Sequence, residues 1–503
     1  MQAQSGASAA PTPQPVAARA RGRKVRVAVE GCAHGRLTDI YNAVSKRGAV
    51  DLLLICGDFQ AVRNPGDLAC MSVPDKYKEM GEFYKYYTGE LRAPVLTLVI
   101  GGNHEASNYM QELFYGGWLA PNIYYLGQAG VVRVGGLRIA GMSGIFNERH
   151  YMQDLRRQER PPYTPAGKRS VYHIRPFEVA QLSFLTGRLD VFLSHDWPLG
   201  IAHFGNTGKL LSEKKFLRKE VMSNTLGSPP GAMLLNLLRP VRWFSAHMHV
   251  RFAALVRHAP PPPAPGNVAN TAVSQSMPSS STTMDSSASD GFVPAEDVGG
   301  DDTVVLKPQS VQGAGLPDTT EFLALDKCLP GRKYLEIVEL EAPEAEPEGP
   351  LDLAYDPEWL AIMELTQMQV APPPRRAAMN WEELRGVVEG RRAELTKKWA
   401  ERDLVIDPAW FERTVTAYDP TQEEQRRHFR RARAPLQMGN PQTDRFLDTL
   451  GLGHRWPVTI AWKKQGTNST AQAASSSHGG GVSASSSASL AAVTDENEID
   501  IGL

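Results

Sequence analysis

The sequence predicts an α/β fold with a polar site where its strands end. Apolar, β-branched runs recur through the first half of the chain, polar motifs follow them, and the last third has a helical pattern. The runs lie at residues 25–29, 52–55, 95–100, 191–193 and 241–244. Such runs are typical of buried strands in an α/β sheet, and their carboxyl ends share one edge of that sheet.

Five short motifs follow these runs, and together they hold seven metal-ligand candidates and a further histidine. They are Gly31-Cys32-Ala33-His34, Gly57-Asp58, Gly101-Gly102-Asn103-His104-Glu105, Ser194-His195 and Ala246-His247-Met248-His249. Glycines permit tight turns and close backbone approach, so several strand ends can deliver side chains into one crevice. The sequence therefore predicts an active site at this edge of the sheet.

The residue types in the motifs suit two divalent cations. Asp58 is the natural bridge, because one carboxylate can offer an oxygen to each cation. Asn103 can offer only a neutral carbonyl oxygen, and His104 is then held beside the cations without binding them. A lone Gly-Asp is more often a turn, and a lone His-x-His is more often free of metal. Five ligand-bearing strand ends in one order nevertheless favour a metal site.

Later parts of the chain predict further strands and then helices. Apolar and β-branched residues predict strands at 250–256, 321–325 and 333–340. Helix formers with apolar residues at helical spacing predict helices at 358–368, 381–401 and 421–433. We therefore expect a smaller α-rich domain after the last strand.

Composition sets limits on compartment and partners. The formal net charge of the 503-residue chain is −1, so a polyanionic partner must meet a local basic patch. Cys32, Cys56, Cys70 and Cys328 are too few and too scattered for a disulfide framework, which indicates a reducing, intracellular compartment. No stretch is apolar for long enough to span a bilayer, and we expect no membrane partner.

Low-complexity segments divide the chain. The composition of residues 1–24 predicts a disordered leader. This leader is a nuclear localisation signal, an organelle transit peptide or a tail without a targeting role. The remaining segments are expected to be a catalytic domain at 25–258, a Pro/Ser-rich disordered insertion at 259–317, strands completing the catalytic domain at 318–345, a C-terminal domain at 346–464 and a disordered tail at 465–503.

The ordered motifs resemble the calcineurin-like metallophosphoesterase superfamily, whose pattern is Asp-x-His, Gly-Asp, Gly-Asn-His-Glu/Asp, His and Gly-His-x-His. Ala246 replaces a glycine of that pattern, and Cys32 replaces its first aspartate. Gly-Cys-x-His at this position is a mark of the RNA lariat debranching enzymes. Further stretches agree with that family at 26–32, 56–64, 115–127, 138–146, 169–173, 193–198 and 322–330.

The resemblance implies a metallophosphoesterase β-sandwich flanked by helices, with a smaller α-rich C-terminal domain. It assigns one cation to Cys32, His34, Asp58 and His249, a second to Asp58, Asn103, His195 and His247, and the role of general acid to His104. A thiolate is a soft ligand, which favours Fe²⁺ or Zn²⁺ in the Cys32 pocket, while Mn²⁺ suits the harder pocket.

The activity implied is hydrolysis of the 2′–5′ phosphodiester bond at the branch point of excised intron lariat RNA. The product is a linear intron for turnover, and the expected setting is the nucleus, with spliceosome-associated proteins as further partners. Aromatic and basic residues interleave along 143–173, which suits unpaired RNA. The expected recognition loop comprises Ser143, Gly144, Phe146, Tyr163, Lys168, Arg169, Tyr172 and His173.

Other functions use the same kind of site. A protein or nucleotide phosphatase has an aspartate first, so Cys32 disfavours that class. A catalytically inactive scaffold is disfavoured by the complete ligand set and His104. Another RNA or nucleotide phosphodiesterase with a looser branch requirement stays open. A second basic run at 426–433 is expected to be a solvated helix face or a nuclear signal.

Overall fold

The computed structural model describes residues 23–152, 159–259, 316–342, 351–369, 381–422, 432–433 and 439–452. The expected leader, the expected insertion, the C-terminal tail, the helix at 421–433 and the basic run at 426–433 lie wholly or mostly outside these residues. Within the described ranges, no helix combines the length and apolar character needed to cross a bilayer.

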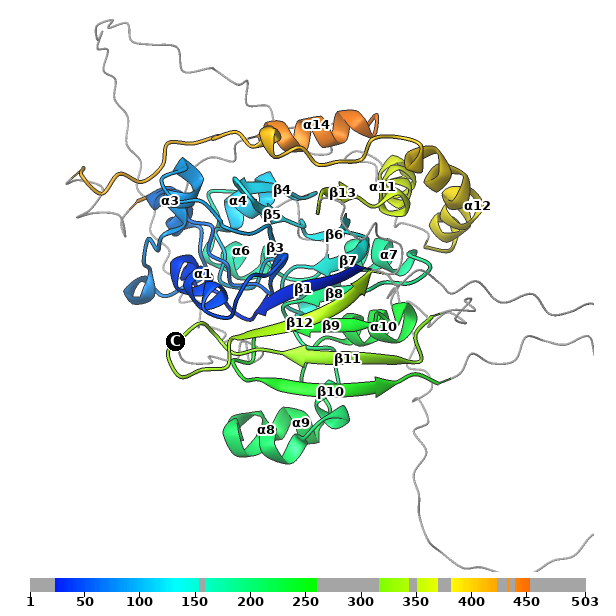
Figure 1. Ribbon diagram of the computed structural model, residues 1–503, viewed down its shortest axis with the longest axis horizontal. Helices are drawn as coiled ribbons and strands as arrows, with labels where there is room; N and C mark the ends of the chain where they lie inside the picture. Colours follow the sequence, from blue (N-terminus) through cyan, green and yellow to red (C-terminus); the bar gives the residue numbers. More distant parts are fainter. Residues whose placement is uncertain are drawn as a thin grey trace, which may run out of the picture.

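Two mixed β-sheets form the centre of the molecule (Figure 1). The first sheet has six strands in the order β12-β1-β2-β3-β5-β4, and the second has seven in the order β10-β11-β9-β8-β7-β6-β13. The strands are β1 (Arg23–Glu30), β2 (Leu52–Ile55), β3 (Thr97–Val99), β4 (Gly117–Ala120), β5 (Ile123–Tyr125), β6 (Ala129–Val134), β7 (Leu137–Met142), β8 (Val191–Ser194), β9 (Arg242–Ser245), β10 (Phe252–Arg257), β11 (Thr319–Ala324), β12 (Leu335–Ala342) and β13 (Leu353–Tyr355).

Helices surround the sheets. They are α1 (Leu37–Ser45), α2 (Pro65–Ala69), α3 (Phe83–Thr88), α4 (Ser107–Glu112), α5 (Glu148–Met152), α6 (Pro165–Ser170), α7 (Pro176–Ser183), α8 (Thr207–Glu213), α9 (Arg218–Met222), α10 (Pro229–Leu238), α11 (Pro357–Gln369), α12 (Trp381–Ala400) and α14 (Pro441–Thr449). Short 3-10 turns add η1 (Asp75–Tyr77), η2 (Ile201–Phe204), η3 (Lys215–Leu217) and η4 (Pro408–Trp410).

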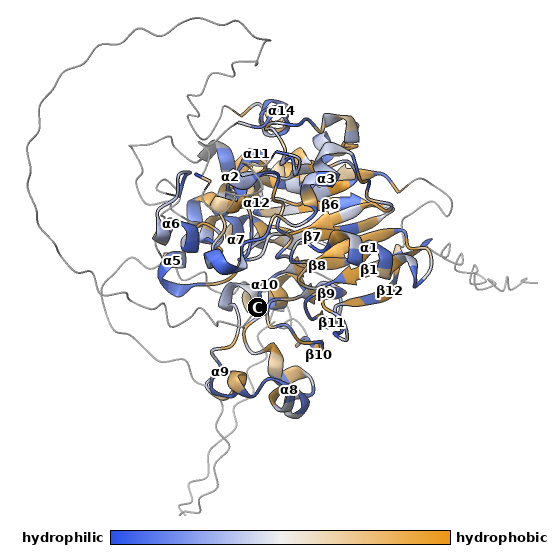
Figure 2. Ribbon diagram, turned by 90° about the vertical axis from the view of Figure 1, so that its left-hand side faces the viewer, coloured by the Kyte–Doolittle hydropathy of each residue, from blue (hydrophilic) through white to orange (hydrophobic). Residues whose placement is uncertain are grey.

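The strands separate three apolar layers. Alternate side chains of a strand point to opposite faces, so Leu52 and Leu54 of β2 lie between the sheets while Leu53 and Ile55 face the outer helices. Helices α1, α3 and α4 cover the six-stranded sheet, and α7, α10, α11 and α12 cover the seven-stranded sheet. The central strands are mostly hydrophobic, whereas α1 carries a hydrophilic surface (Figure 2). The expected α/β sandwich flanked by helices is confirmed.

Each strand expected from the sequence is present, with ends that shift by a few residues. Strands β1, β2 and β3 run parallel in one sheet, and β7, β8, β9 and β11 run parallel in the other. The ligand motifs directly follow β1, β2, β3, β8 and β9, which brings them to the carboxyl edges of the two packed sheets. Strands β4 to β7 and β13 were not predicted.

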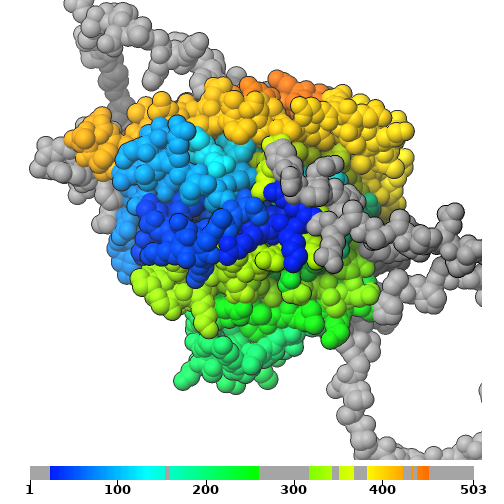
Figure 3. Space-filling model, viewed as in Figure 1, coloured from blue at the N-terminus to red at the C-terminus, as the bar shows by residue number. Residues whose placement is uncertain are grey.

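The C-terminal segment packs directly on the sheets. Helices expected at 358–368 and 381–401 are present as α11 and α12, and their apolar side chains share one cluster with β6 and α7. Helix α14 is tied to β4, because the Gln442 amide accepts from the Trp118 N–H at 2.7 Å and donates to its carbonyl at 3.0 Å. In Figure 3 the yellow and orange residues form a band across one end of the molecule. The expected boundary near residue 345 stays a prediction.

Candidate metal centre

The backbone at four predicted ligand positions is left-handed. The φ angles are 45° at His34, 49° at Asp58, 59° at His247 and 49° at His249. Residues with a Cβ rarely adopt this conformation, which costs on the order of 1–3 kcal/mol each and persists where the surroundings enforce it. Four such residues gathered in one place therefore indicate a site built for function.

Two motif glycines allow the loops to close around the ligands. A Cβ on Gly57 would lie 2.3 Å from His195 Nδ1, and a Cβ on Gly102 would lie 2.3 Å from Asp58 Oδ1. Both distances are far inside van der Waals contact. Any other residue at either position would push a predicted ligand out of place.

The first predicted ligand group comes together around one point. One ligand atom from each of Cys32, His34, Asp58 and His249 lies within 4.8 Å of all the others. The two imidazole Nε2 atoms of His34 and His249 are 3.4 Å apart, and His34 Nε2 lies 3.7 Å from Asp58 Oδ2. Asp58 Oδ2 is buried and has no hydrogen-bond partner within the described residues. A buried carboxylate oxygen without a hydrogen bond, among a thiol and two imidazoles, fits a divalent cation.

The second predicted ligand group lies beside Oδ1, the other oxygen of the Asp58 carboxylate. His195 Nε2 is 3.4 Å from Asp58 Oδ1 and 3.2 Å from Asn103 Oδ1. The rings of His195 and His247 have centroids 5.0 Å apart. Asp58 thus presents one oxygen to each group, as a bridging carboxylate must. The assignment of each ligand to one of two cations stays a prediction.

Neighbouring contacts fix the orientation of the ligands. His195 Nδ1 donates to the Cys56 carbonyl at 2.7 Å, which leaves Nε2 facing Asp58 and Asn103. The Glu105 carboxylate accepts backbone N–H groups of Phe59 at 2.8 Å, Gln60 at 2.8 Å and Gly102 at 2.9 Å. Glu105 therefore ties the loop after β2 to the loop after β3.

Sequence reasoning gave Glu105 no role. The available signal was its place at the end of the Gly101–Glu105 motif, where an acidic residue belongs to the family pattern.

Burial changes the pKa values of several predicted ligands. Burial lowers the pKa of His34 to about 4 and that of His247 to about 3, so both imidazoles are neutral near neutral pH. Burial opposes ionisation of Asp58, but nearby His195, His104 and His34 hold its pKa well below the usual range. Burial, with Asp58 beside it, raises the pKa of the Cys32 thiol. Three ligands are thus ready to coordinate, whereas Cys32 must lose a proton first.

His104 lies beside the carboxylate without joining either group. Its backbone N–H donates to Asp58 Oδ1 at 2.9 Å, and its ring lies 5.7 Å from that of His34. His104 Nδ1 is buried without a hydrogen-bond partner in the described part of the chain. The ring also lines a cleft of about 730 Å³ together with Asp58, Asn103, His247 and His249. It can therefore meet a substrate that approaches the metal centre.

Two segments form the rest of the cleft. Pro165, Lys168 and Arg169 come from α6, so two cations of the expected recognition loop border the metal centre. The other segment is 71–78, which includes η1 and was not predicted to take part. No periodic pattern in the sequence marked it.

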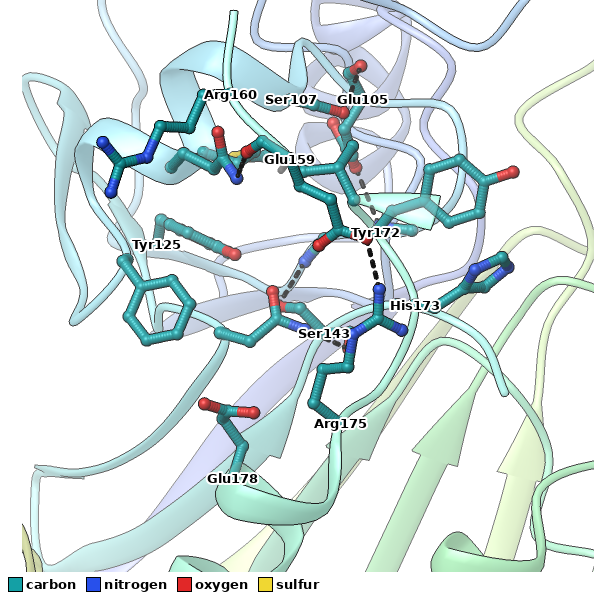
Figure 4. A pocket seen from close by; sticks show the side chains of 18 residues that line it. Glu105, Ser107, Tyr125, Ser143, Glu159, Arg160, Tyr172, His173, Arg175 and Glu178 are labelled. Carbon is teal, nitrogen blue, oxygen red and sulfur yellow. Dashed lines mark hydrogen bonds and ion pairs between the residues drawn. The ribbon is translucent and has the colours of Figure 1, made fainter. Parts of the chain in front are cut away.

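Four members of the expected recognition loop line a second, inner pocket instead. Ser143, Gly144, Tyr172 and His173 surround about 50 Å³, too little space for a nucleotide. Figure 4 shows Glu159 and Arg175 pointing toward each other there, with Arg175 Nη2 2.5 Å from Glu159 Oε1. The Ser143 hydroxyl accepts the Gly101 N–H at 2.9 Å, so Ser143 supports the loop after β3.

The two remaining members are packed within the protein. Phe146 is half-buried against the cluster that includes α7 and α11, and Tyr163 is buried with its hydroxyl on Gln111 Oε1 at 2.5 Å. In this arrangement the aromatic rings anchor the loop, while Lys168 and Arg169 reach the cleft. Contact of these eight residues with RNA stays a prediction.

Two family models match the chain. The model of calcineurin-like phosphoesterases matches residues 25–251, which include every predicted ligand. The model of the C-terminal domain of lariat debranching enzyme matches residues 317–455, which include β11, β12 and the C-terminal helices.

Relatives named lariat debranching enzyme align with most of the chain. The Danio rerio protein is 45% identical over 439 residues, which cover 85% of this chain and 66% of the relative. The Arabidopsis thaliana protein is 43% identical over 433 residues, covering 85% and 86% respectively. The Homo sapiens protein is 43% identical over 441 residues, covering 85% and 69%. The chain thus spans just under two thirds of the zebrafish relative and most of the Arabidopsis one. It belongs to the lariat debranching enzyme family, with a calcineurin-like phosphoesterase domain.

Proposed function

We propose that this protein hydrolyses the 2′–5′ phosphodiester bond at the branch point of excised intron lariat RNA and so releases linear intron for turnover. One observation carries the proposal: Cys32 occupies the first ligand position of a phosphoesterase centre that lies under a cleft with basic walls. The names and alignments of the relatives support the choice of a branched RNA as substrate.

Two divalent cations fit the donor set. Cys32, His34, Asp58 and His249 would hold one, and Asp58, Asn103, His195 and His247 the other. Such cations offset charge on phosphate oxygens and lower the pKa of water to about 7. The soft thiolate of Cys32 favours Fe²⁺ or Zn²⁺ in its group, and the second group also suits Mn²⁺.

His104 supplies the proton that the leaving group needs. Hydrolysis breaks the bond between phosphorus and the 2′-oxygen and forms a bond between phosphorus and a water oxygen. The 2′-oxygen gains a proton and ends as a hydroxyl, while the phosphate stays on the other RNA strand. The backbone hydrogen bond from His104 to Asp58 holds residue 104 beside the candidate metal centre, and His104 lines the cleft. A positioned imidazole of this kind contributes roughly 10²–10⁴-fold to the rate.

The chemistry of the substrate also suggests a location. Excised lariats arise where introns are removed, so we place the protein in the nucleus, near spliceosome-associated proteins. Imaging of the full-length chain alongside a splicing factor tests this part. A uniform distribution through the cytoplasm would contradict it.

The test of the activity compares two synthetic RNAs. One carries a 2′–5′ branch, and the other is a linear 3′–5′ RNA of matched sequence; the protein is loaded with Zn²⁺, Fe²⁺ or Mn²⁺ in separate reactions. We expect scission at the branch alone, with a free 2′-hydroxyl on one product and a phosphate on the other. Cleavage of both RNAs would indicate a general phosphodiesterase, and cleavage of neither would indicate a scaffold.

A further inference from the structure

The cleft over the metal centre has a wall to which neither the sequence nor the proposed reaction gives a role. Residues 71–78 run between α2 and α3 and line the same cleft as Asn103 and His104. Tyr77 and Lys76 end the short turn η1, and Lys78 follows it directly. An aromatic ring and two cations thus lie in one short segment beside the reacting centre.

Tyr77 is an exposed ring in a functional cleft. Its exposed fraction is 44%, whereas Met71 in the same cleft lining is buried. Lys76 Nζ lies 4.5 Å from the centre of the ring, close enough for a cation–π contact. An exposed ring next to a cation is suited to stacking against an unpaired base.

Lys78 and Lys168 both line this cleft. The Lys78 side chain is only 8% exposed and pairs with Asp75 at 2.8 Å. Lys168 lies in α6, distant in the sequence from Lys78. Burial lowers the pKa of Lys168, and the positive charge of Lys78 lowers it further. Asp75 is a carboxylate that acts on both lysines, and its side chain is 78% exposed. A phosphate that enters the cleft beside these two lysines would be attracted by their positive charges.

We propose that Tyr77, Lys78 and Lys168 form a subsite for one RNA arm of the branch, with a base stacked on Tyr77 and its phosphate held between the two lysines. This inference rests on the proposed function. A branch nucleotide joins three phosphodiester arms, whereas a nucleotide within linear RNA joins two. A subsite beside the metal centre that holds an additional arm favours branched RNA over linear RNA.

The test measures steady-state kinetics of Tyr77→Ala on two branched RNAs. One carries full-length arms, and the other is trimmed of its arm bases, with an abasic residue in place of every nucleotide except the branch nucleotide. On the full substrate we expect KM to rise about 5- to 100-fold, the loss associated with one base–aromatic stack, with kcat nearly unchanged. On the trimmed substrate KM should rise much less than on the full substrate, because the base that stacks on Tyr77 is absent.

Matched variants separate stacking from general damage. Tyr77→Phe keeps the ring and should keep the wild-type KM. Phe216→Ala removes a ring of similar exposure, 50%, that does not line the cleft, and should have no effect. Lys168→Ala should raise KM for the full substrate and reduce its dependence on salt, because one phosphate contact is lost.

The outcomes distinguish this inference from the proposed function. A wild-type protein that cleaves no branched RNA overturns the proposed function itself. A wild-type protein that debranches normally, with the same KM in Tyr77→Ala, overturns the subsite alone. An equal loss on the trimmed and full substrates would show that Tyr77 supports the fold or the metal centre, and would also overturn it.

Discussion

The Cys32 thiol accepts the backbone N–H of His247 at 3.3 Å, which joins the first ligand motif of the chain to the last. The contact crosses between the two sheets, because Cys32 follows β1 and His247 follows β9. The centre is therefore assembled only when both sheets are packed. Cys32 is also the ligand whose protonation must change on binding a cation.

Binding of Zn²⁺ should release a proton from Cys32. Burial raises the pKa of this thiol, so it is protonated near neutral pH, whereas His34 and His247 are already neutral. Because thiolate is the ligand form, the wild type should release about one proton more per protein than Cys32→Asp. Calorimetry of Zn²⁺ binding in buffers of different ionisation enthalpy measures the difference. Equal release by both proteins would contradict a thiolate ligand.

Peroxide should inactivate the wild type faster than Cys32→Asp. A cation-bound thiolate oxidises to sulfenic and higher acids, and a carboxylate at the same position does not. Residual debranching after timed peroxide exposure measures the effect. Cys70→Ala, which removes another buried thiol, should stay as sensitive as the wild type. The prediction fails if Cys32→Asp and the wild type lose activity together.

The stability of the metal-free protein should fall as the pH falls from about 7 to about 4. The folded pKa of His34 is about 4, below the value of about 6.5 in an unfolded chain, so the unfolded state binds the proton first. The folded state then loses up to about 1.4 kcal/mol per pH unit for this group. Urea unfolding should give a shallower pH slope for His34→Asn. Identical slopes would mean that His34 is not buried as a neutral imidazole.

Removing the buried guanidinium of Arg63 should be among the most damaging substitutions outside the centre. Arg63 is fully buried, contacts Asp67 at 2.7 Å and Glu112 at 2.8 Å, and reaches Thr414 of the C-terminal segment at 3.0 Å. Arg63→Ala would leave two buried carboxylates without their cation, at a cost of about 3–5 kcal/mol in the free energy of unfolding.

An exposed ion pair provides the control for Arg63. Lys209 and Glu213 lie 3.8 Å apart on α8, and both side chains are about half exposed. Lys209→Ala should change the free energy of unfolding by less than about 1 kcal/mol. Denaturant unfolding of both variants measures the contrast. A comparable small effect in Arg63→Ala would show that the buried network contributes little to stability.

The sequence carried enough information to predict where the candidate ligands meet, because each one follows a short apolar run and a constrained turn. Gly57 and Gly102 illustrate this. A Cβ at either position would collide with His195 or Asp58, and both glycines belong to the sequence motifs. Parallel strands then bring consecutive strand ends to one edge whatever the intervening loops contain. Local patterns of this kind can be recognised without knowledge of the tertiary structure.

The features that were not predicted depend on contacts between distant segments. Residues 71–78 carry no periodic pattern, and only their position beside α6 makes Tyr77 and Lys78 part of the cleft. Composition alone cannot distinguish a ring that meets RNA from one that anchors a loop, as buried Tyr163 illustrates. Strand β13 has three residues, too short for its pattern to stand out from the surrounding sequence.

The most direct test of the account is debranching by His104→Ala under single-turnover conditions, with bound metal measured in the same sample. The backbone N–H that supports Asp58 survives this substitution, so the metal content should match the wild type. The rate of 2′–5′ cleavage should fall roughly 10²–10⁴-fold, as expected for loss of a general acid. A rate near that of the wild type, with normal metal content, would contradict the assignment of His104; a loss of metal would show that His104 is needed to hold the cations.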